Sequence, residues 1–330
     1  MSGPVSGPVS GPGSGPASAP AADAWTLADI PDQAGRTVLV TGTTVGGLGQ
    51  FTALELARRG ARVVLAGRRQ ERLDEARAAI AEQVPAADLP TVLIDLADLG
   101  SVRRAAAEVA GIGAIDVLVN NAGVMAPPHS RTADGLELQM ATNHFGPFLL
   151  TGLLLPQLAR SQGARVVTVS SQMHRAARRP PLQDPRAERG RYWRWHVYGQ
   201  SKLANLLFTF ELDRRLRAAE LPVKALAAHP GFASTHLVAN GQLGRSRGGA
   251  ASILDAAVKA VSPSRPDQGA WPTLMAATAD LPGSTYCGPS RLSEWSGPPH
   301  VTTPNRLARD EDAQRRLWEL SEQVTGISYP

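Results

Sequence analysis

Tyr198 and Lys202 lie four residues apart in the segment YGQSK, directly before the apolar run LANLLFTF. Residues i and i+4 share one face of an α-helix, so a helix here brings a phenol and an ammonium group together. A neighbouring positive charge favours the phenolate and is expected to lower the pKa of Tyr198 from about 10. Such a tyrosine can give and take a proton near neutral pH, as alcohol–carbonyl interconversion requires. Because Tyr-x-x-x-Lys is also common on ordinary surface helices, the pair alone assigns no function.

The sequence also contains a glycine-rich turn, TGTTVGGLG (41–49), between an apolar run, RTVLV (36–40), and a helical stretch, QFTALELARRG (50–60). In a strand–turn–helix unit of this kind, the first amides of the helix can hold a pyrophosphate. Five further motifs follow in order: IDVLVNNAG (115–123), TNHFG (142–146), ARVVTVSS (164–171), YGQSK (198–202) and AAHPG (227–231).

The order and content of these motifs resemble the short-chain dehydrogenase/reductase family. The sequence is most similar to the retinol-dehydrogenase-like bacterial branch of this family, in segments such as WTLADIPDQAGRTVLVTG, ELQMATNHFGPFLLTGLLLP and RRLWELSEQVTGI. The resemblance runs from about Trp25 to the C-terminus. It implies an oxidoreductase that acts on CH–OH groups with a nicotinamide cofactor.

Short β-rich runs alternate with longer helical patterns along the chain. We expect strands at 36–41, 62–66, 91–94, 115–120, 164–170, 223–228 and 284–287, and helices at 47–59, 70–83, 99–110, 132–160, 197–217 and 310–324. This alternation predicts an α/β fold, a doubly wound parallel sheet of the Rossmann type, in which ligands bind outside the carboxyl ends of the strands. Residues 25–330 are expected to form this single domain. Residues 1–24 are expected to be a disordered leader, since they are rich in Gly, Pro, Ala and Ser.

The cofactor residues are expected at several strand ends. Arg68 and Arg69 follow the second strand, where NAD enzymes tend to carry an acid and arginine accommodates a 2′-phosphate; NADP is therefore favoured over NAD, with Arg68 the better candidate. Solvated arginines at the start of a helix are the alternative. The resemblance adds an adenine-side contact, the strand-joining NNAG motif and a nicotinamide-side turn: Asp95, Leu96, Asn121, Ala122, Gly123, Pro230, Gly231 and Thr235. Asp95 could equally cap a helix.

The glycine turn departs from the family pattern of Thr-Gly, three residues, Gly, one residue, Gly. Gly42 is followed by Gly47 and Gly49, one position later than the pattern has them. The turn is interpreted as a one-residue insertion in which these glycines pack the helix start. Cofactor contacts are expected from Gly42, Thr43, Thr44, Gly47, Leu48 and Gly49. A longer turn moves the amides that should point at the pyrophosphate, so a rearranged cofactor site and a non-redox role both remain open.

For the catalytic set, the resemblance implies Asn143, Ser171, Tyr198 and Lys202. Ser171 would bind the substrate oxygen and Tyr198 would transfer the proton. Lys202 would hold the nicotinamide ribose, and Asn143 would anchor a water that leads to it. The segment before the tyrosine, RRPPLQDPRAERGRYWRWHV, contains two tryptophans and could wall a pocket for an apolar small molecule.

Other classes of function have weaker support. GRSRG (244–248) matches the Gly-x-Ser-x-Gly hydrolase pattern but lacks the preceding strand. The seven histidines show no metal-ligand spacing, and the net charge of +5 is spread over mixed-charge helices without a nucleic-acid-binding block. No apolar run approaches the roughly 18 residues of a membrane span. Cys287 is the only cysteine, consistent with a reducing cytoplasm. A homo-oligomer is compatible with the resemblance. The rival interpretation is a nucleotide-binding relative with a non-redox role, such as a cyclase, an isomerase or a regulatory binder.

Overall fold

The computed structural model describes Gly3 and residues 24–179, 191–231 and 267–330. Most of the expected leader, GRSRG (244–248) and Thr235 therefore lie outside the described residues. Within the described ranges, eight strands form one sheet in the order β3-β2-β1-β4-β5-β6-β7-β8. The strands are β1 (Thr37–Thr41), β2 (Arg62–Gly67), β3 (Thr91–Leu93), β4 (Val117–Asn120), β5 (Ala164–Val169), β6 (Val223–Ala228), β7 (Tyr286–Arg291) and β8 (Ser296–Val301).

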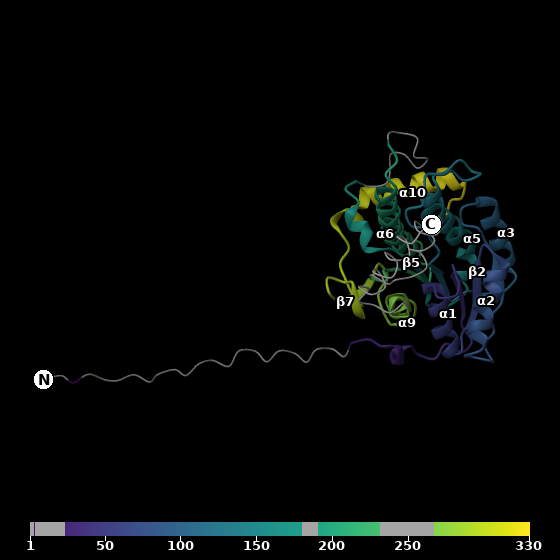
Figure 1. Ribbon diagram of the computed structural model, residues 1–330. Helices are drawn as coiled ribbons and strands as arrows, with labels where there is room; N and C mark the ends of the chain where they lie inside the picture. The colour runs from purple at the N-terminus through teal and green to yellow at the C-terminus, as the bar shows by residue number, and fades with distance from the viewer. Residues whose placement is uncertain (1–2, 4–23, 180–190, 232–266) are drawn as a thin grey trace, which may run out of the picture.

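Helices cover both faces of this sheet (Figure 1). The longer ones are α1 (Leu48–Arg58), α2 (Gln70–Ala81), α3 (Leu99–Ala110), α5 (Gly146–Leu158), α6 (Arg194–Ala218), α9 (Trp271–Thr278) and α10 (Glu311–Thr325). Since the side chains of a buried parallel strand alternate between faces, each strand contributes to two apolar cores. In β1, Leu39 packs into the core under α3, α5, α6 and α10, while Val38 and Val40 pack into the core over α1, α2 and α9.

The expected doubly wound parallel sheet is confirmed. Strands β1 to β7 are paired in parallel, while β8 pairs antiparallel with β7 at one edge. The strand order reverses between β1 and β4, which is the position where such sheets form a ligand crevice at the carboxyl ends of their strands. The carboxyl ends of β1, β4, β5 and β6 border this crevice.

One expected helix was wrong in its extent. In place of a continuous helix over 132–160, the chain forms a turn around Gly135 and a bridge between Arg131 and Glu137. It then forms α4 (Leu138–Met140), a five-residue π-helical turn, η2 (Ala141–Phe145), and α5. Gly135 has φ +73°, a left-handed conformation that ends helical geometry, so the helix cannot begin before it. Helix α9 and strand β8 were not predicted from the sequence.

Among the residues that the structure describes, no helix is both long enough and apolar enough to cross a membrane.

Candidate active site

Tyr198 and Lys202 lie one turn apart on α6, as their spacing predicted. Both side chains are buried, and the Lys202 Nζ atom lies 5.8 Å from the centre of the Tyr198 ring. Lys202 Nζ donates a hydrogen bond of 3.0 Å to the carbonyl of Val169, the last residue of β5. The helix therefore places the phenol and the ammonium group at the carboxyl end of the central strands.

The pKa of Tyr198 differs from the expectation that Lys202 lowers it. Burial raises the pKa of Tyr198 to about 12, and a hydrogen bond with Ser171 acts in the opposite direction. Burial also lowers the pKa of Lys202 to about 8. Both shifts favour the neutral forms, since each charged form loses hydration in the protein interior. In this structure, desolvation of the pair outweighs any mutual stabilisation of a phenolate and an ammonium ion.

Ser171 is the second residue after the end of β5 and lies beside Tyr198. It caps a short 3-10 helix, η3 (Gln172–Ala176), with its Oγ accepting from the Met173 amide at 3.2 Å. Helix η3 packs closely against α6: a Cβ at Gly199 would lie 2.8 Å from the carbonyl oxygen of Met173. Glycine at position 199 thus allows the approach that brings Ser171 and Tyr198 together.

Asn143 lies within the π-helical turn η2, and its side chain forms three hydrogen bonds with the protein. The Oδ1 atom accepts from the Val124 amide at 2.8 Å, while Nδ2 donates to the Val124 carbonyl at 3.0 Å and to Ser201 Oγ at 2.9 Å. π-Helical turns often occur at functional sites. These bonds tie the loop after β4 to α6, and the predicted water between Asn143 and Lys202 stays a prediction.

The glycine turn after β1 is an ordered loop that approaches the NNAG motif closely. Gly42 has φ +76°, and a Cβ there would lie 2.9 Å from Ala122 Cα. A Cβ at Gly49 would lie 2.6 Å from both Asn121 Nδ2 and the Gly42 carbonyl oxygen. These two glycines are required by close packing.

The insertion itself is held by hydrogen bonds. Gly46 has φ +74°, and its amide donates to Gln50 Oε1 at 2.7 Å. Gly47 is the N-cap of α1, which begins at Leu48, and its amide donates to the carbonyl of exposed Thr44 at 2.9 Å.

The buried hydroxyl of Thr43 fits a contact with a phosphate ligand. Its side chain is fully buried at the carboxyl end of β1, and its Oγ1 has no hydrogen-bond partner among the described residues. A buried hydroxyl is normally paired, so an oxygen of a bound ligand is a partner that it could take. Together with the start of α1, Thr43 forms a setting that fits a pyrophosphate.

The NNAG motif joins β1 to β4 and leads toward the catalytic residues. Asn121 Nδ2 donates to the Thr41 carbonyl at 2.7 Å, and the Ala122 amide donates to Thr41 Oγ1 at 3.0 Å. A Cβ at Gly123 would lie 3.0 Å from Asn143 Oδ1 and 3.4 Å from Lys202 Nζ. The motif thus connects the glycine turn with the catalytic set.

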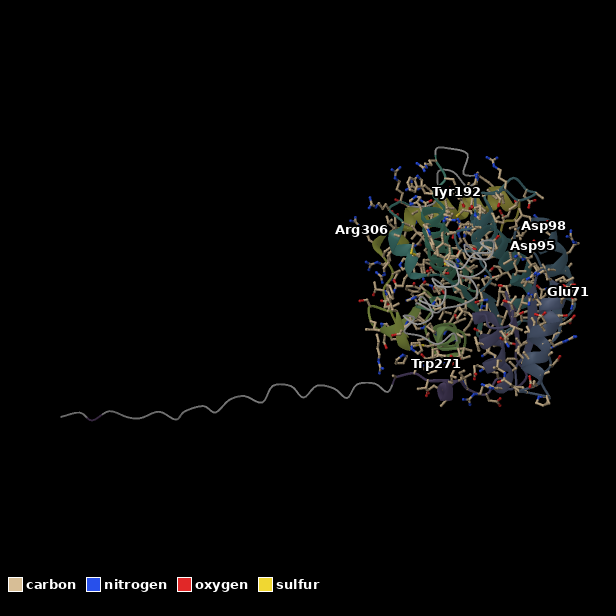
Figure 2. All side chains as sticks on the ribbon, in the orientation of Figure 1. Glu71, Asp95, Asp98, Tyr192, Trp271 and Arg306 are labelled. Atoms are coloured by element: carbon tan, nitrogen blue, oxygen red, sulfur yellow. The ribbon has the colours of Figure 1, made fainter. Side chains whose placement is uncertain are left out.

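The expected adenine-side and 2′-phosphate residues follow β3 and β2. Asp95 Oδ1 accepts from the Ala97 amide at 2.9 Å, and Leu96 is buried. Asp98, which Figure 2 places beside Asp95, caps α3 by accepting from the Ser101 amide, so Asp95 is not the helix cap. Arg68 is exposed directly after β2 and forms no ion pair within the described ranges.

The Pro230–Gly231 turn is held by a contact that was not predicted from the sequence. Gly231 has φ +67°, and a Cβ there would lie 2.5 Å from the carbonyl oxygen of Trp295 in the β7–β8 turn. Glu294, in the same turn, accepts from His229 Nε2 at 3.1 Å and from Gln172 Nε2 at 2.6 Å. No local spacing in the sequence indicates this contact.

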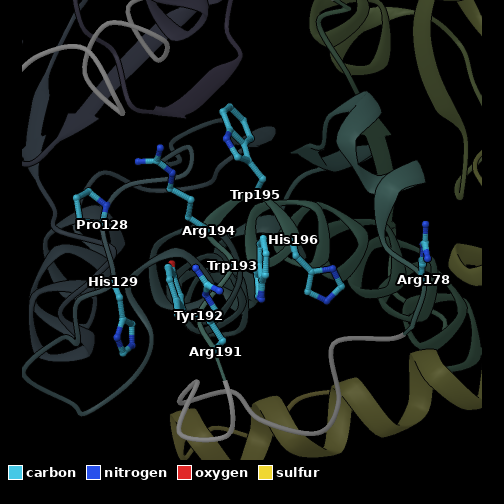
Figure 3. Close-up of a pocket in the computed structure, with 9 residues that line it drawn as sticks. All are labelled: Pro128, His129, Arg178, Arg191, Tyr192, Trp193, Arg194, Trp195 and His196. Atoms are coloured by element: carbon cyan, nitrogen blue, oxygen red, sulfur yellow. The ribbon is translucent and has the colours of Figure 1, made fainter.

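A pocket opens beside the N-terminal end of α6, and we call it the tryptophan pocket (Figure 3). It has a volume of about 970 Å³, and Trp193 and Trp195 form part of its wall. Neither Tyr198 nor Ser171 lines it, but the Trp195 ring lies edge-on to the Tyr198 ring, with 6.3 Å between ring centres. Tyr192, the other tyrosine nearby, donates to Glu137 Oε1 and has a structural role.

Comparisons with known proteins agree with this arrangement. Residues 36–182 match the family model described as short chain dehydrogenase. The chain is 37% identical to human retinol dehydrogenase 13 over 90% of this chain and 86% of that protein. It is 36% identical to mouse polyprenol dehydrogenase, with the same shares of each chain covered.

Two solved structures are similar to this chain in fold and sequence. The fold is similar to the crystal structure of an uncharacterised protein from Mycobacterium paratuberculosis, with a TM-score of 0.74, 44% identity, and coverage of 93% of this chain and 99% of that chain. It is also similar to an NAD(P)-dependent gluconate 5-dehydrogenase from Beutenbergia cavernae with bound NADP, with a TM-score of 0.55, 27% identity, and coverage of 74% and 90%. The chain belongs to the short-chain dehydrogenase/reductase family of oxidoreductases.

Proposed function

We propose that this protein is an NADP(H)-dependent oxidoreductase that interconverts a carbonyl and a primary or secondary alcohol on an apolar small molecule, within a biosynthetic pathway. The observation that carries the proposal is the cluster of two buried side chains, Tyr198 and Lys202, with half-buried Ser171, beside the crevice at the carboxyl ends of β4, β5 and β6. Relatives named retinol dehydrogenase 13 and polyprenol dehydrogenase support an apolar alcohol or carbonyl as the substrate class.

Each residue of this cluster has a proposed role in proton transfer. NADP(H), when bound, supplies or accepts the hydride. Ser171 binds the substrate oxygen and directs it to the Tyr198 hydroxyl. In reduction, Tyr198 protonates the developing alkoxide; in oxidation, it takes the alcohol proton. Its pKa of about 12 suits an acid that stays protonated until an alkoxide develops. Lys202, with a pKa of about 8, can exchange a proton near neutral pH.

The preference for NADP rests on Arg68. Its exposed guanidinium directly follows β2 and has no acidic partner among the described residues. A free guanidinium at this position accommodates a 2′-phosphate, whereas NAD enzymes carry an acid there. The gluconate 5-dehydrogenase with bound NADP supports the same choice. A cytoplasmic location belongs to the proposal and is supported by Cys287, a buried free thiol.

One observation favours a second candidate function. The glycine turn is one residue longer than the family pattern, and hydrogen bonds hold the extra residue in an ordered loop. If this turn moves the nicotinamide away from Tyr198, the protein binds nucleotide in a non-redox role, as a cyclase, an isomerase or a regulatory binder.

The two functions are separated by measuring turnover and binding together. The absorbance of NADPH is followed against a panel of apolar ketones and aldehydes, and NADPH binding is measured by calorimetry on the same protein. We expect both binding and oxidation of NADPH. Binding without oxidation across a panel that includes retinoid, steroid and lipid aldehydes would favour the non-redox role.

A further inference from the structure

One carboxylate oxygen joins two segments that border the catalytic residues. Glu294, in the β7–β8 turn, accepts through Oε2 from Gln172 Nε2 at 2.6 Å and from His229 Nε2 at 3.1 Å. Gln172 belongs to helix η3, and His229 directly precedes the Pro230–Gly231 turn. Hydrogen bonds to a charged acceptor are stronger than those between neutral groups. Oε2 therefore ties these two segments to each other as well as to the β7–β8 turn.

The first segment holds Ser171 in a fixed position. Gln172 directly follows Ser171, so a bond at the Gln172 side chain acts within one residue of the expected substrate contact. His174 Nδ1 lies 2.7 Å from the Ser171 carbonyl oxygen, and His174 Nε2 accepts from the Asn305 amide at 3.2 Å. Because Nε2 accepts, the ring proton resides on Nδ1 and is donated to Ser171. Ser171 is thus held by the C-terminal part of the chain as well as by the bond at Gln172.

The second segment is the Pro230–Gly231 turn, which is expected to lie beside the nicotinamide. The His229 ring is fully buried, and its Nδ1 accepts from the Gly231 amide at 3.2 Å while its Nε2 donates to Glu294. A Cβ at Gly288 in β7 would overlap His229 Nε2, so only glycine leaves room for this ring. A shift of the turn therefore moves the His229 ring and, with it, the bond to Glu294.

The carboxylate of Glu294 is also anchored through its other oxygen. Oε1 accepts from the hydroxyl of Thr302, the residue directly after β8, and from Arg175 Nη2 at 3.5 Å. Only 19% of the Glu294 side chain is exposed. With both oxygens bonded, the carboxylate cannot turn to follow one segment without breaking a bond to another.

The ring of Tyr286 packs against the same two segments. It is buried, with its centre 5.7 Å from that of the His174 ring in η3 and 5.2 Å from that of the His229 ring. Because protein interiors are close-packed and transmit strain, this ring provides a second route by which a displacement of one segment reaches the other.

We propose that Glu294 is a positioning residue that couples the cofactor site to the substrate site. This inference rests on the proposed function, in which Ser171 binds the substrate oxygen and the Pro230–Gly231 turn contacts the nicotinamide. NADP(H) orders the turn, His229 transmits this order to Oε2, and Gln172 transmits it to Ser171. Because coupling between two sites is reciprocal, cofactor and substrate each increase the affinity for the other by the same factor.

Hydrogen–deuterium exchange on the full chain, with and without saturating NADP, measures this coupling without a substrate. The reporters are the amides of residues 172–177, among which His174 and Ala177 form backbone hydrogen bonds at η3. We expect NADP to slow their exchange by about fivefold or more, the lower end of the usual range for coupled sites. Unchanged exchange in the wild type at saturating NADP would overturn the inference.

Variants assign the slower exchange to Glu294. Gln172→Met keeps the length of the side chain and removes the amide that Oε2 binds, and Glu294→Leu removes the carboxylate. In both, NADP should no longer slow exchange in residues 172–177, while it should still slow exchange in the glycine turn, residues 42–49. A merely structural role would change exchange with and without NADP alike. If Gln172→Met retains the full effect, the inference is overturned, whether or not Glu294→Leu folds.

A conservative variant and a matched control complete the series. Glu294→Gln should retain part of the effect, because an amide oxygen can replace Oε2 while the amide nitrogen donates to the Thr302 hydroxyl. Gln83→Met makes the same exchange of side chain as Gln172→Met at an exposed glutamine after α2, which donates to the Ala79 carbonyl. It should leave the effect of NADP unchanged.

Turnover keeps this inference separate from the proposed function. NADPH oxidation by the panel of ketones and aldehydes is measured on the same proteins. Slower exchange that depends on Gln172 and Glu294, without oxidation of NADPH by any member of the panel, would support the coupling and refute the redox proposal. Oxidation of NADPH, together with slower exchange that Gln172→Met retains, would do the reverse.

Discussion

His229 and Glu294 are joined by a hydrogen bond of 3.1 Å, although 65 residues separate them in the chain. His229 Nδ1 accepts from the Gly231 amide at 3.2 Å, so the ring proton must reside on Nε2 and be donated to the Glu294 carboxylate. Burial lowers the pKa of His229, which keeps the ring neutral. One imidazole thus fixes the Pro230–Gly231 turn to the β7–β8 turn.

The β7–β8 turn has an unusual backbone that this contact helps to explain. Leu292, Ser293 and Glu294 have φ values of +51°, +54° and +67°, three consecutive left-handed residues without a glycine. Each such residue costs about 1–2 kcal/mol, and strain of this kind persists only where surrounding contacts determine it. Glu294 supplies those contacts through its bonds to His229 and Gln172.

The first prediction concerns the stability that Glu294 provides. Burial acts to raise the pKa of Glu294, but hydrogen bonds from His229 and Thr302 and the nearby charge of Arg175 outweigh it and hold the pKa at about 2, below the usual 4.5. This stabilisation is fully present above pH 4.5 and is lost as the pH falls from 4.5 toward 2. We expect Glu294→Gln to reduce the free energy of unfolding by about 1–3 kcal/mol at pH 7.

Urea unfolding of both proteins at a series of pH values measures this effect. The difference between wild type and Glu294→Gln should narrow steadily below pH 4.5. Glu311→Gln is a matched control, since Glu311 pairs with exposed Arg315 on the surface of α10 and should change stability little. A difference for Glu294→Gln that is constant across this range would show that its carboxylate charge is not what stabilises the turn.

Features that depend on local spacing could be predicted from the sequence. The seven expected strands were found, and the four-residue spacing placed Tyr198 and Lys202 on one helix face. Gly47 and Gly49 were expected to pack the start of the helix, and a Cβ would lie 3.0 Å from the Thr44 carbonyl oxygen at Gly47 and 2.6 Å from Asn121 Nδ2 at Gly49. In these cases the spacing of residues along the chain directly determines which side chains lie on the same face of a helix or strand.

Features that depend on tertiary contacts could not be predicted. The Glu294–His229 bond joins two turns that only the assembled sheet brings together. The pKa of Tyr198 rises because the pair is desolvated, and the depth of burial is not encoded in a four-residue spacing. The π-helical turn around Asn143 also has no local signal, since its bonds to Val124 and Ser201 form only in the folded chain.

The second prediction tests the proton donor. Tyr198→Phe removes one hydroxyl from a buried ring and should lower kcat by about 10²–10⁴-fold, because general acid–base help is lost. NADPH binding, measured by calorimetry, should stay within a few-fold of wild type. Tyr329→Phe is the matched control, since the Tyr329 hydroxyl donates to the Phe148 carbonyl, outside both the catalytic set and the tryptophan pocket. Near-normal turnover by Tyr198→Phe would remove this residue from the proposed mechanism.

The third prediction tests cofactor choice. Arg68→Asp exchanges a phosphate partner for a repelling charge, so the Kd for NADPH should rise by about 10–100-fold while the Kd for NADH changes little. Arg69→Asp, one residue further along the chain, should have a smaller effect on NADPH. The measurement is a pair of dissociation constants, for NADPH and NADH, on wild type and on each variant. Equal losses for both cofactors with Arg68→Asp would mean that the 2′-phosphate lies elsewhere.

The fourth prediction concerns the unpaired hydroxyl of Thr43. Thr43→Val keeps the shape of the side chain and removes an oxygen that has no protein partner, so thermal stability should be nearly unchanged or slightly raised. If this hydroxyl binds a phosphate of NADP(H), affinity should fall by about tenfold. Differential scanning fluorimetry and calorimetry give the two readouts. Lost stability with unchanged affinity would assign Thr43 to the fold instead of the cofactor.

The last prediction concerns the longer glycine turn. If the extra residue merely bulged, deleting Gly46 would restore the family spacing and preserve NADP(H) binding. The structure favours the other outcome, because the Gly46 amide is bonded to Gln50, a buried residue of α1, and Thr43 is held beneath the turn. We therefore expect the deletion to weaken NADP(H) binding by about tenfold or more.

Gly46→Ala is the control, because it keeps the length of the turn and adds strain at φ +74°. This variant should cost about 1 kcal/mol of stability and retain most of the affinity for NADP(H). Calorimetric titration of both variants with NADP(H) separates the effect of turn length on affinity from the effect of backbone strain. Unchanged or tighter binding by the deletion variant would show that the extra residue has no part in holding the cofactor.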